Sequence, residues 1–157
     1  MLDGIPREAF SYFAHETNRA NGLVADLCSG AAPASFAAVG LGLTAYPVAV
    51  ERGFLSRGEA VERTLTTLRF FWRGKQGPEP DATGYRGFYH HFLDMRTGAH
   101  VWRSELSTVD TALLLAGMLT AAACFDADTT ADARSAISPN GCTRGWIGRG
   151  SGTVAPR

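Results

Sequence analysis

The residues best suited to chemistry gather in one segment of the sequence, 102–111. It contains two carboxylates, Glu105 and Asp110, an indole ring, Trp102, and hydroxyl residues such as Ser107. The segment runs directly into the apolar stretch 112–125, which is typical of a buried helix. A charged side chain beside a buried helix is costly unless it has a role, so we take this junction as the candidate site.

The two carboxylates each have an ordinary alternative explanation. Trp102 would desolvate Glu105 and raise its pKa, whereas the start of the following helix would lower it. The residues alone leave open which effect wins, and Glu105 could equally be a surface acid on a hairpin. Ser107 is a predicted helix cap, and Asp110, three residues later, occupies the acidic position of a capping box.

The segment before this junction predicts a short β-hairpin. Residues 88–93 and 99–102 are apolar and aromatic, and they flank the turn-like sequence 94–98. Alternation along the strand would place Tyr89 and His91 on one face and His90 on the other, which argues against a metal site built on the two histidines. Asp94 would either hold the turn or orient a ligand hydroxyl.

Apolar spacing predicts four helices, over about 6–17, 35–53, 57–72 and 108–125. Ser35 is a plausible cap for the second helix, and 56–59 (SRGE) is a capping box for the third. The short connection between these two helices predicts an antiparallel pair. Gly40 in the second helix implies a close neighbouring backbone, and the last helix has so little polar surface that we expect it to be surrounded on most sides.

Composition excludes several classes of protein. The 157 residues suffice for one domain, and 15 basic against 15 acidic residues give no electrostatic case for binding nucleic acid or an anionic membrane. The apolar run 112–125 is shorter than the roughly 20 residues that cross a bilayer. Three cysteines without metal-ligand spacing indicate neither a disulfide framework nor a zinc site, and we expect no cofactor. Residues 1–8 do not have the pattern of an export signal.

The two ends of the chain differ in character. Residues 2–132 carry the helical patterns, whereas 133–157 is predicted to be an irregular tail rich in Gly, Pro, Ser and Thr. The tail is unlike the sequence before it, and we interpret it as a disordered terminus or, preferably, out-of-frame translation. The punctuated stretch 74–87 is predicted to be a surface loop.

Several long motifs, taken in order, resemble the glucoamylase-like domain family. They are 37–47 (AAVGLGLTAYP), 50–53 (VERG), 63–71 (RTLTTLRFF), 88–94 (FYHHFLD) and 104–117 (SELSTVDTALLLAG). The resemblance covers roughly residues 2–132. It implies an all-α fold consisting of the first helices of an (α/α)6 toroid, truncated, with a small β-hairpin insertion.

The resemblance also implies an activity. Members of this family include bacterial endo-β-1,2-glucanases and the cyclising domain of cyclic β-1,2-glucan synthases, which act on their glucans by inversion. The implied partner is therefore an oligo- or polysaccharide glucan. Such a domain is much longer than this chain, so we expect the chain alone to be inactive and the second carboxylate to be supplied by the missing part.

The family motif assigns roles to the candidate residues. Glu105 falls in the Ser-Glu-Leu-Ser-Thr signature and is the leading catalytic candidate, with Asp110 second. The expected substrate contacts are Tyr89, His90, His91, Asp94 and Trp102, which are types that stack on sugar rings or bond their hydroxyls. Two rival hypotheses remain: a non-catalytic helical module that binds carbohydrate or protein, and part of a glucan transglycosylase.

Overall fold

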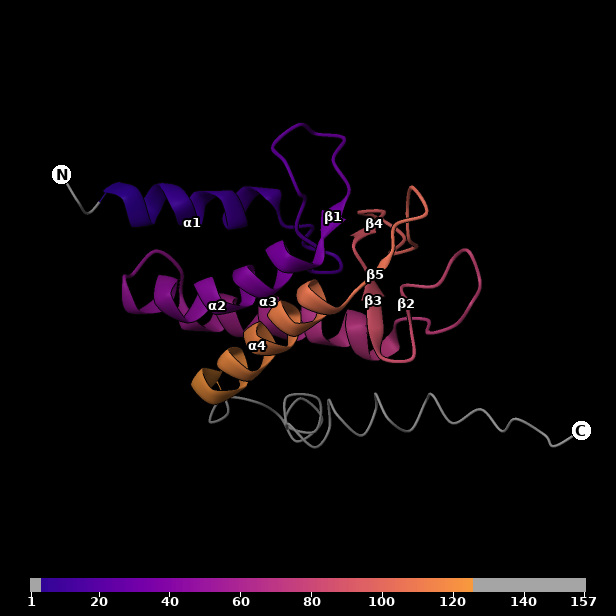
Figure 1. Ribbon diagram of the computed structural model, residues 1–157. Coiled ribbons are helices and arrows are strands. Elements are labelled where there is room, and N and C mark those ends of the chain that lie inside the picture. The colour runs from indigo at the N-terminus through magenta and orange to yellow at the C-terminus, as the bar shows by residue number, and fades with distance from the viewer. Residues whose placement is uncertain (1–3, 126–157) are drawn as a thin grey trace, which may run out of the picture.

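The computed structural model describes residues 4–125, which are mostly helical (Figure 1). The helices are α1 (Gly4–Glu16), α2 (Phe36–Glu51), α3 (Arg57–Arg73) and α4 (Thr108–Phe125). One small antiparallel sheet pairs β1 (Ala34–Ser35) with β4 (Phe92–Leu93), and another has the order β2 (Gly84–Tyr85), β3 (Phe88–His90), β5 (Leu106–Ser107). The prediction of a mostly helical fold is confirmed; the tail 133–157 and its boundary lie outside the described residues.

The helices begin where the capping residues predict. The Ser56 hydroxyl accepts a hydrogen bond from the Glu59 amide at 3.2 Å, and the Ser107 hydroxyl accepts one from the Asp110 amide at the same distance. Both hydroxyls satisfy amides that a helix start leaves unpaired. Ser35 also directly precedes a helix, but its side chain makes no capping bond.

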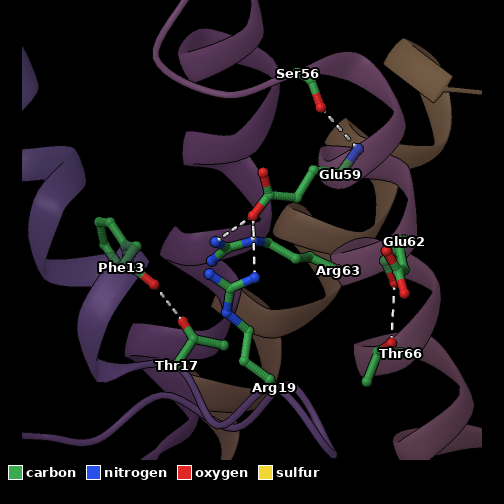
Figure 2. A network of polar contacts seen from close by, with 8 residues as sticks. All are labelled: Phe13, Thr17, Arg19, Ser56, Glu59, Glu62, Arg63 and Thr66. Atoms are coloured by element: carbon green, nitrogen blue, oxygen red, sulfur yellow. Dashed lines mark hydrogen bonds and ion pairs between the residues drawn. The ribbon is translucent and has the colours of Figure 1, made fainter.

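Helices α2 and α3 run antiparallel, as their short connection predicts (Figure 1). The Glu59 carboxylate on α3 forms ion pairs with Arg63 of the same helix and with Arg19 in the turn after α1 (Figure 2). Glu59 Oε1 lies 2.8 Å from Nη2 of Arg63, which is 7% exposed, and 3.0 Å from Nη1 of Arg19. A buried guanidinium needs such a partner, so Glu59 fixes the position of Arg63 within the helix pair.

Helix α4 packs on α2 with backbone against backbone. A Cβ atom added to Gly40 would lie 2.4 Å from the Leu113 carbonyl oxygen, and one added to Gly117 would lie 2.2 Å from the Gly40 carbonyl oxygen. No side chain fits at either position. The expectation that Gly40 meets a close neighbour is confirmed, and α4 is that neighbour.

An aromatic cluster joins the helices to the three-stranded sheet. The rings of Phe36 on α2, Phe71 on α3 and Tyr89 on β3 lie 4.9 to 5.4 Å apart between centroids. Phe36 and Tyr89 are each 1% exposed, and Phe71 is 6% exposed. Burial of rings of this size dominates the stability of a small core, so β3 is anchored by its central residue.

The predicted hairpin is confirmed only next to its turn. There the antiparallel bridge between Leu93 and His100 is flanked by bonds from the Asp94 amide to the Ala99 carbonyl at 2.8 Å and from the Val101 amide to the Phe92 carbonyl at 3.2 Å. The rest of the segment 88–93 pairs elsewhere, since β3 pairs with β2 and β5, and β4 pairs with β1. The turn at 94–98 is as predicted, with Gly98 at a φ of 73°.

Helix α4 is less enclosed than its composition predicts. Val109, Leu113 and Leu119 are 68%, 39% and 53% exposed, so the prediction that it is surrounded on most sides is wrong for the described chain. With its first turn included, α4 is also long and apolar enough to cross a membrane by length and composition. Core helices of globular proteins pass the same test, and the other side of α4 packs on α2.

We predict that Gly117→Ala destabilises the chain by about 1–3 kcal/mol, because the new methyl group must push α2 and α4 apart. Gly58→Ala is the matched control. Its Cβ would meet no atom within 4 Å, so this change in the first turn of α3 should leave stability equal or higher by up to about 1 kcal/mol. Urea unfolding of both variants tests the contact; equal stabilities would contradict it.

Candidate active site

Pairing of β3 with β5 builds the candidate site. The register places Tyr89 opposite Ser107 and His90 opposite Leu106, and the His91 amide continues the ladder by donating to the Glu105 carbonyl at 2.9 Å. The chain then turns through the Ser107 cap into α4. This path brings two carboxylates, one from each side of the cap, to the same imidazole.

His91 lies between the two carboxylates. Its Nδ1 atom is 3.2 Å from Glu105 Oε1 and 3.4 Å from Asp110 Oδ2. The imidazole is about one-third exposed, the Glu105 side chain is 72% exposed and the Asp110 side chain is 10% exposed. Side-chain exposure therefore decreases from Glu105 through His91 to Asp110.

The structure resolves the opposing effects on Glu105. A hydrogen bond from its own backbone amide and a second from His91 lower the pKa of the Glu105 carboxyl. Desolvation acts in the opposite direction but is weaker, because the Glu105 side chain is 72% exposed. Glu105 is therefore an ionised carboxylate at neutral pH.

Asp110 lies in the first turn of α4, as predicted, and also contacts His91, which was not predicted. Its amide is capped by Ser107, while its carboxylate faces His91. Within the described chain, Oδ2 of this buried residue has no hydrogen bond of standard geometry, since the closer contact of His91 is with Glu105. A buried carboxylate oxygen in this condition favours any donor that approaches it.

Tyr89 and His90 are both engaged in contacts within the chain. Tyr89 belongs to the aromatic cluster and is 1% exposed, so no ring face is open to a sugar in the described chain. The His90 Nδ1 atom lies 2.7 Å from the Ser104 carbonyl oxygen, and its ring stacks on His100 at 4.2 Å. Strand β3 ends at His90, so the predicted alternation does not extend to His91.

Trp102 is exposed to solvent and lies in a turn with strained backbone. It is 73% exposed, and both Trp102 and Arg103 have left-handed backbone, with φ of 57° and 54°. Non-glycine residues rarely adopt this conformation, and it clusters at functional sites. The Trp102 ring meets the edge of Phe92 at 5.5 Å, and Phe92 in turn packs on the His91 ring at 4.1 Å. An exposed indole is thereby connected to the carboxylate cluster.

A groove of about 480 Å³ begins at Trp102. It runs between the end of α1, residues 30–33 and the turn 94–98, and its polar lining includes His15, Glu16, Asn18 and Arg96. Asp94 also lines it while holding the turn, because one oxygen accepts bonds from the Arg96 and Thr97 amides at 3.0 and 2.7 Å. Glu105 lies outside this lining.

Among known proteins, matches to this chain were found among solved structures. No protein-family model matches the chain, and no curated protein matches its sequence at a significant level. A putative glucoamylase from Bacteroides uniformis matches with a TM-score of 0.75 and 26% identity, over 90% of this chain and 34% of its own. A β-1,2-glucanase from Parabacteroides distasonis matches with a TM-score of 0.74 and 26% identity, over 92% of this chain and 20% of its own.

The chain resembles the glucoamylase-like proteins. An endo-β-1,2-glucanase from Chitinophaga pinensis, solved with sophorotriose and glucose, has the same fold at 18% identity and a TM-score of 0.71. It is matched over 92% of this chain and 35% of its own. The chain thus spans about a third or less of these glucoamylase-like relatives.

Sequence reasoning missed some residues of this candidate site. Phe92 connects Trp102 to His91, and the Ser104 hydroxyl fixes the turn by bonding the Phe92 carbonyl at 3.2 Å. His15 and Glu16 reach the groove from α1, more than 75 residues away in the chain. Phe92 and Ser104 carried a usable signal, since each lies inside a family motif. Among residues 4–125 no cluster of His, Cys, Asp or Glu is arranged to hold a metal.

We predict a pH-dependent contribution of Asp94 to stability. Bonds from the Thr97 amide and hydroxyl, and from the Arg96 amide, lower the pKa of this carboxyl, so its contribution is present above the unfolded pKa of about 3.9 and lost as pH falls through the lower folded pKa. Asp94→Asn keeps an acceptor but removes the charge. It should cost under about 1 kcal/mol at pH 7, since the group is partly solvated, and nothing at low pH.

Urea unfolding at pH 7 and below pH 3 measures this difference. Asp94→Ala, which removes the acceptor as well, serves as the comparison and should be less stable than the parent chain at both pH values. A gap between the parent chain and Asp94→Asn that is unchanged across this range would rule out the ionised turn.

Proposed function

We propose that this chain is part of a glycoside hydrolase that acts on glucan, with β-1,2-linked glucan as the substrate and inversion as the mechanism. The fold supports the glucan-active class, since the solved relatives include two β-1,2-glucanases. One of them was solved with sophorotriose and glucose. This chain spans 20% and 35% of these two proteins, so we propose the activity for a longer protein that contains it.

The observation that carries this proposal is an ionised, exposed Glu105 connected through His91 and Phe92 to the exposed ring of Trp102. Sugar sites combine a flat aromatic face with a few polar groups that fix orientation. The adjoining groove supplies such polar groups, Asp94 among them. We assign sugar stacking to Trp102 and the reacting carboxylate to Glu105.

The chemistry assigns Glu105 to one half of the reaction. Inversion needs one carboxylic acid to protonate the leaving oxygen and one carboxylate to activate water, with the two about 6.5–9.5 Å apart. An acid with a raised pKa suits the first role and an ionised carboxylate suits the second. The lowered pKa of Glu105 therefore favours the base that activates water.

Asp110 does not fit the role of the second carboxyl group. Oxygens of Glu105 and Asp110 lie 3.2 and 3.4 Å from the same nitrogen of His91, so these oxygens are at most 6.6 Å apart, at the lower limit of the separation that inversion needs, and the imidazole contacts both of them. Asp110 is also 7% exposed, too buried to reach a glycosidic oxygen. We propose that the acid comes from the part of a glucoamylase-like domain that this chain does not include.

The purified chain tests the binding half of the proposal. We expect it to release no reducing sugar from β-1,2-glucan, because it lacks the acid, but to bind β-1,2-linked gluco-oligosaccharides in calorimetric titrations. Trp102→Ala should weaken binding about tenfold or more through loss of stacking. At position 102 alanine and tryptophan are strained alike by the left-handed backbone, so this substitution should not change the backbone strain and the fold should be retained. Trp72→Ala, which removes a partly exposed indole outside the groove lining, is the matched control.

The outcomes separate the candidate functions. Absence of binding, or equal loss in both tryptophan variants, would refute the sugar site. Binding that survives Glu105→Gln unchanged in a folded monomer would favour a non-catalytic carbohydrate-binding module. Release of reducing sugar by the chain alone would show that the acid is within these 157 residues.

A further inference from the structure

His91 is held on three sides. Its amide bonds the Glu105 carbonyl at 2.9 Å, its ring packs on Phe92 at 4.1 Å, and its Nδ1 atom faces Glu105 and Asp110. These contacts come from the backbone, from a neighbouring aromatic ring and from charged side chains. The imidazole therefore has one orientation, in which a single nitrogen meets both carboxylates.

The two carboxylates compete for one hydrogen. Nδ1 of an imidazole carries at most one proton, and both Glu105 and Asp110 accept hydrogen bonds when ionised. Both neighbours are acceptors, so the arrangement requires the proton on Nδ1 and leaves Nε2 as the other site of the ring. Asp110 is buried, and its Oδ2 atom makes no hydrogen bond of standard geometry among the described residues, so the proton on His91 Nδ1, 3.4 Å away, is the donor that this oxygen faces.

We propose that His91 is a positioning residue, which holds the Glu105 carboxylate in place with a proton that the buried Asp110 fixes on Nδ1. Asp110 thus acts through His91 and not on the substrate. The consequence for hydrolysis rests on the proposed function of Glu105. The arrangement of the three side chains does not, and it is tested separately.

Charge around Glu105 comes from three elements. His91 follows β3, His90 lies on β3 and acts on Glu105 through its charge, and Asp110 faces His91 from α4. The contact is of little use for stability, because Glu105 is 72% exposed and surface pairs contribute little. Its use is geometric: a long, flexible side chain is kept in one direction.

The first test reads the imidazole directly. Long-range ¹H–¹⁵N spectra of the four histidines report which ring nitrogen is protonated, and we expect His91 in the Nδ1–H form at a pH where the ring is neutral. The double variant Glu105→Ala with Asp110→Ala should lose this preference. Asp110→Ala alone should keep it in part, because Glu105 still accepts. An Nε2–H form of His91 in the parent chain would overturn the proposal.

The second test reads Glu105 by ¹³C titration of its carboxyl group. His91→Phe keeps a ring packed on Phe92 but removes the donor, and it should raise the pKa of Glu105 part of the way to the ordinary value, because the backbone bond remains. His15→Phe is the matched control, since this exposed ring bonds the Ser11 carbonyl on α1 and should leave the Glu105 titration unchanged. An unchanged Glu105 titration in His91→Phe would overturn the proposal.

Sugar binding then separates this proposal from the proposed function. His91→Phe should weaken binding of β-1,2-linked gluco-oligosaccharides about tenfold if Glu105 contacts the sugar. If no variant of the chain binds sugar, the proposed function fails, but the two spectroscopic tests still decide the role of His91. If binding depends on Trp102 while His91 fails both spectroscopic tests, the proposed function stands and the positioning role is refuted.

Discussion

The close contact of α2 and α4 at Gly40 and Gly117 is the constraint on which the site depends. Backbone packed on backbone allows little sliding, since a shift of one residue would bring a side chain into space that holds a carbonyl oxygen. This contact fixes the axis of α4, and with it the position of its first turn. Asp110 lies in that turn, so the buried half of the carboxylate cluster is placed by two glycines at a distance from it.

The second constraint is the anchoring of β3. Tyr89 is locked among Phe36 and Phe71, and its amide also bonds the Thr111 hydroxyl of α4 at 3.1 Å. The strand that carries Tyr89 into the core ends one residue before His91. Since His91 is only two residues from the anchored Tyr89, packing of the core restricts where the imidazole can lie. A preorganised site requires support of this kind.

Apolar side chains are exposed on both helices of the α2–α4 pair. Leu41 and Val48 of α2 are 51% and 53% exposed, and they add to the exposed residues of α4. Leu41 and Val48 line one apolar groove with residues of α1. The solved relatives carry the same fold within chains about three to five times the matched length.

Local sequence signals determined much of this protein. Periodicity and caps gave the four helices with ends accurate to a residue or two, Gly40 gave the close approach of a backbone, and the 94–98 turn followed from its own residues. Family motifs pointed to Glu105, Asp110 and Trp102. These features depend on neighbours in the chain, so the sequence alone is enough to predict them.

Only the tertiary structure decided which of these residues meet. Strand pairing depends on distant partners, so one predicted hairpin became parts of two sheets, and Tyr89 moved from expected ligand contact to core. The pKa of Glu105 depended on a bond from His91 and on the exposure of its side chain, and neither follows from spacing. The shared Nδ1 of His91 arises because β5 and α4 return to the same strand end, a coincidence in space that no local pattern records.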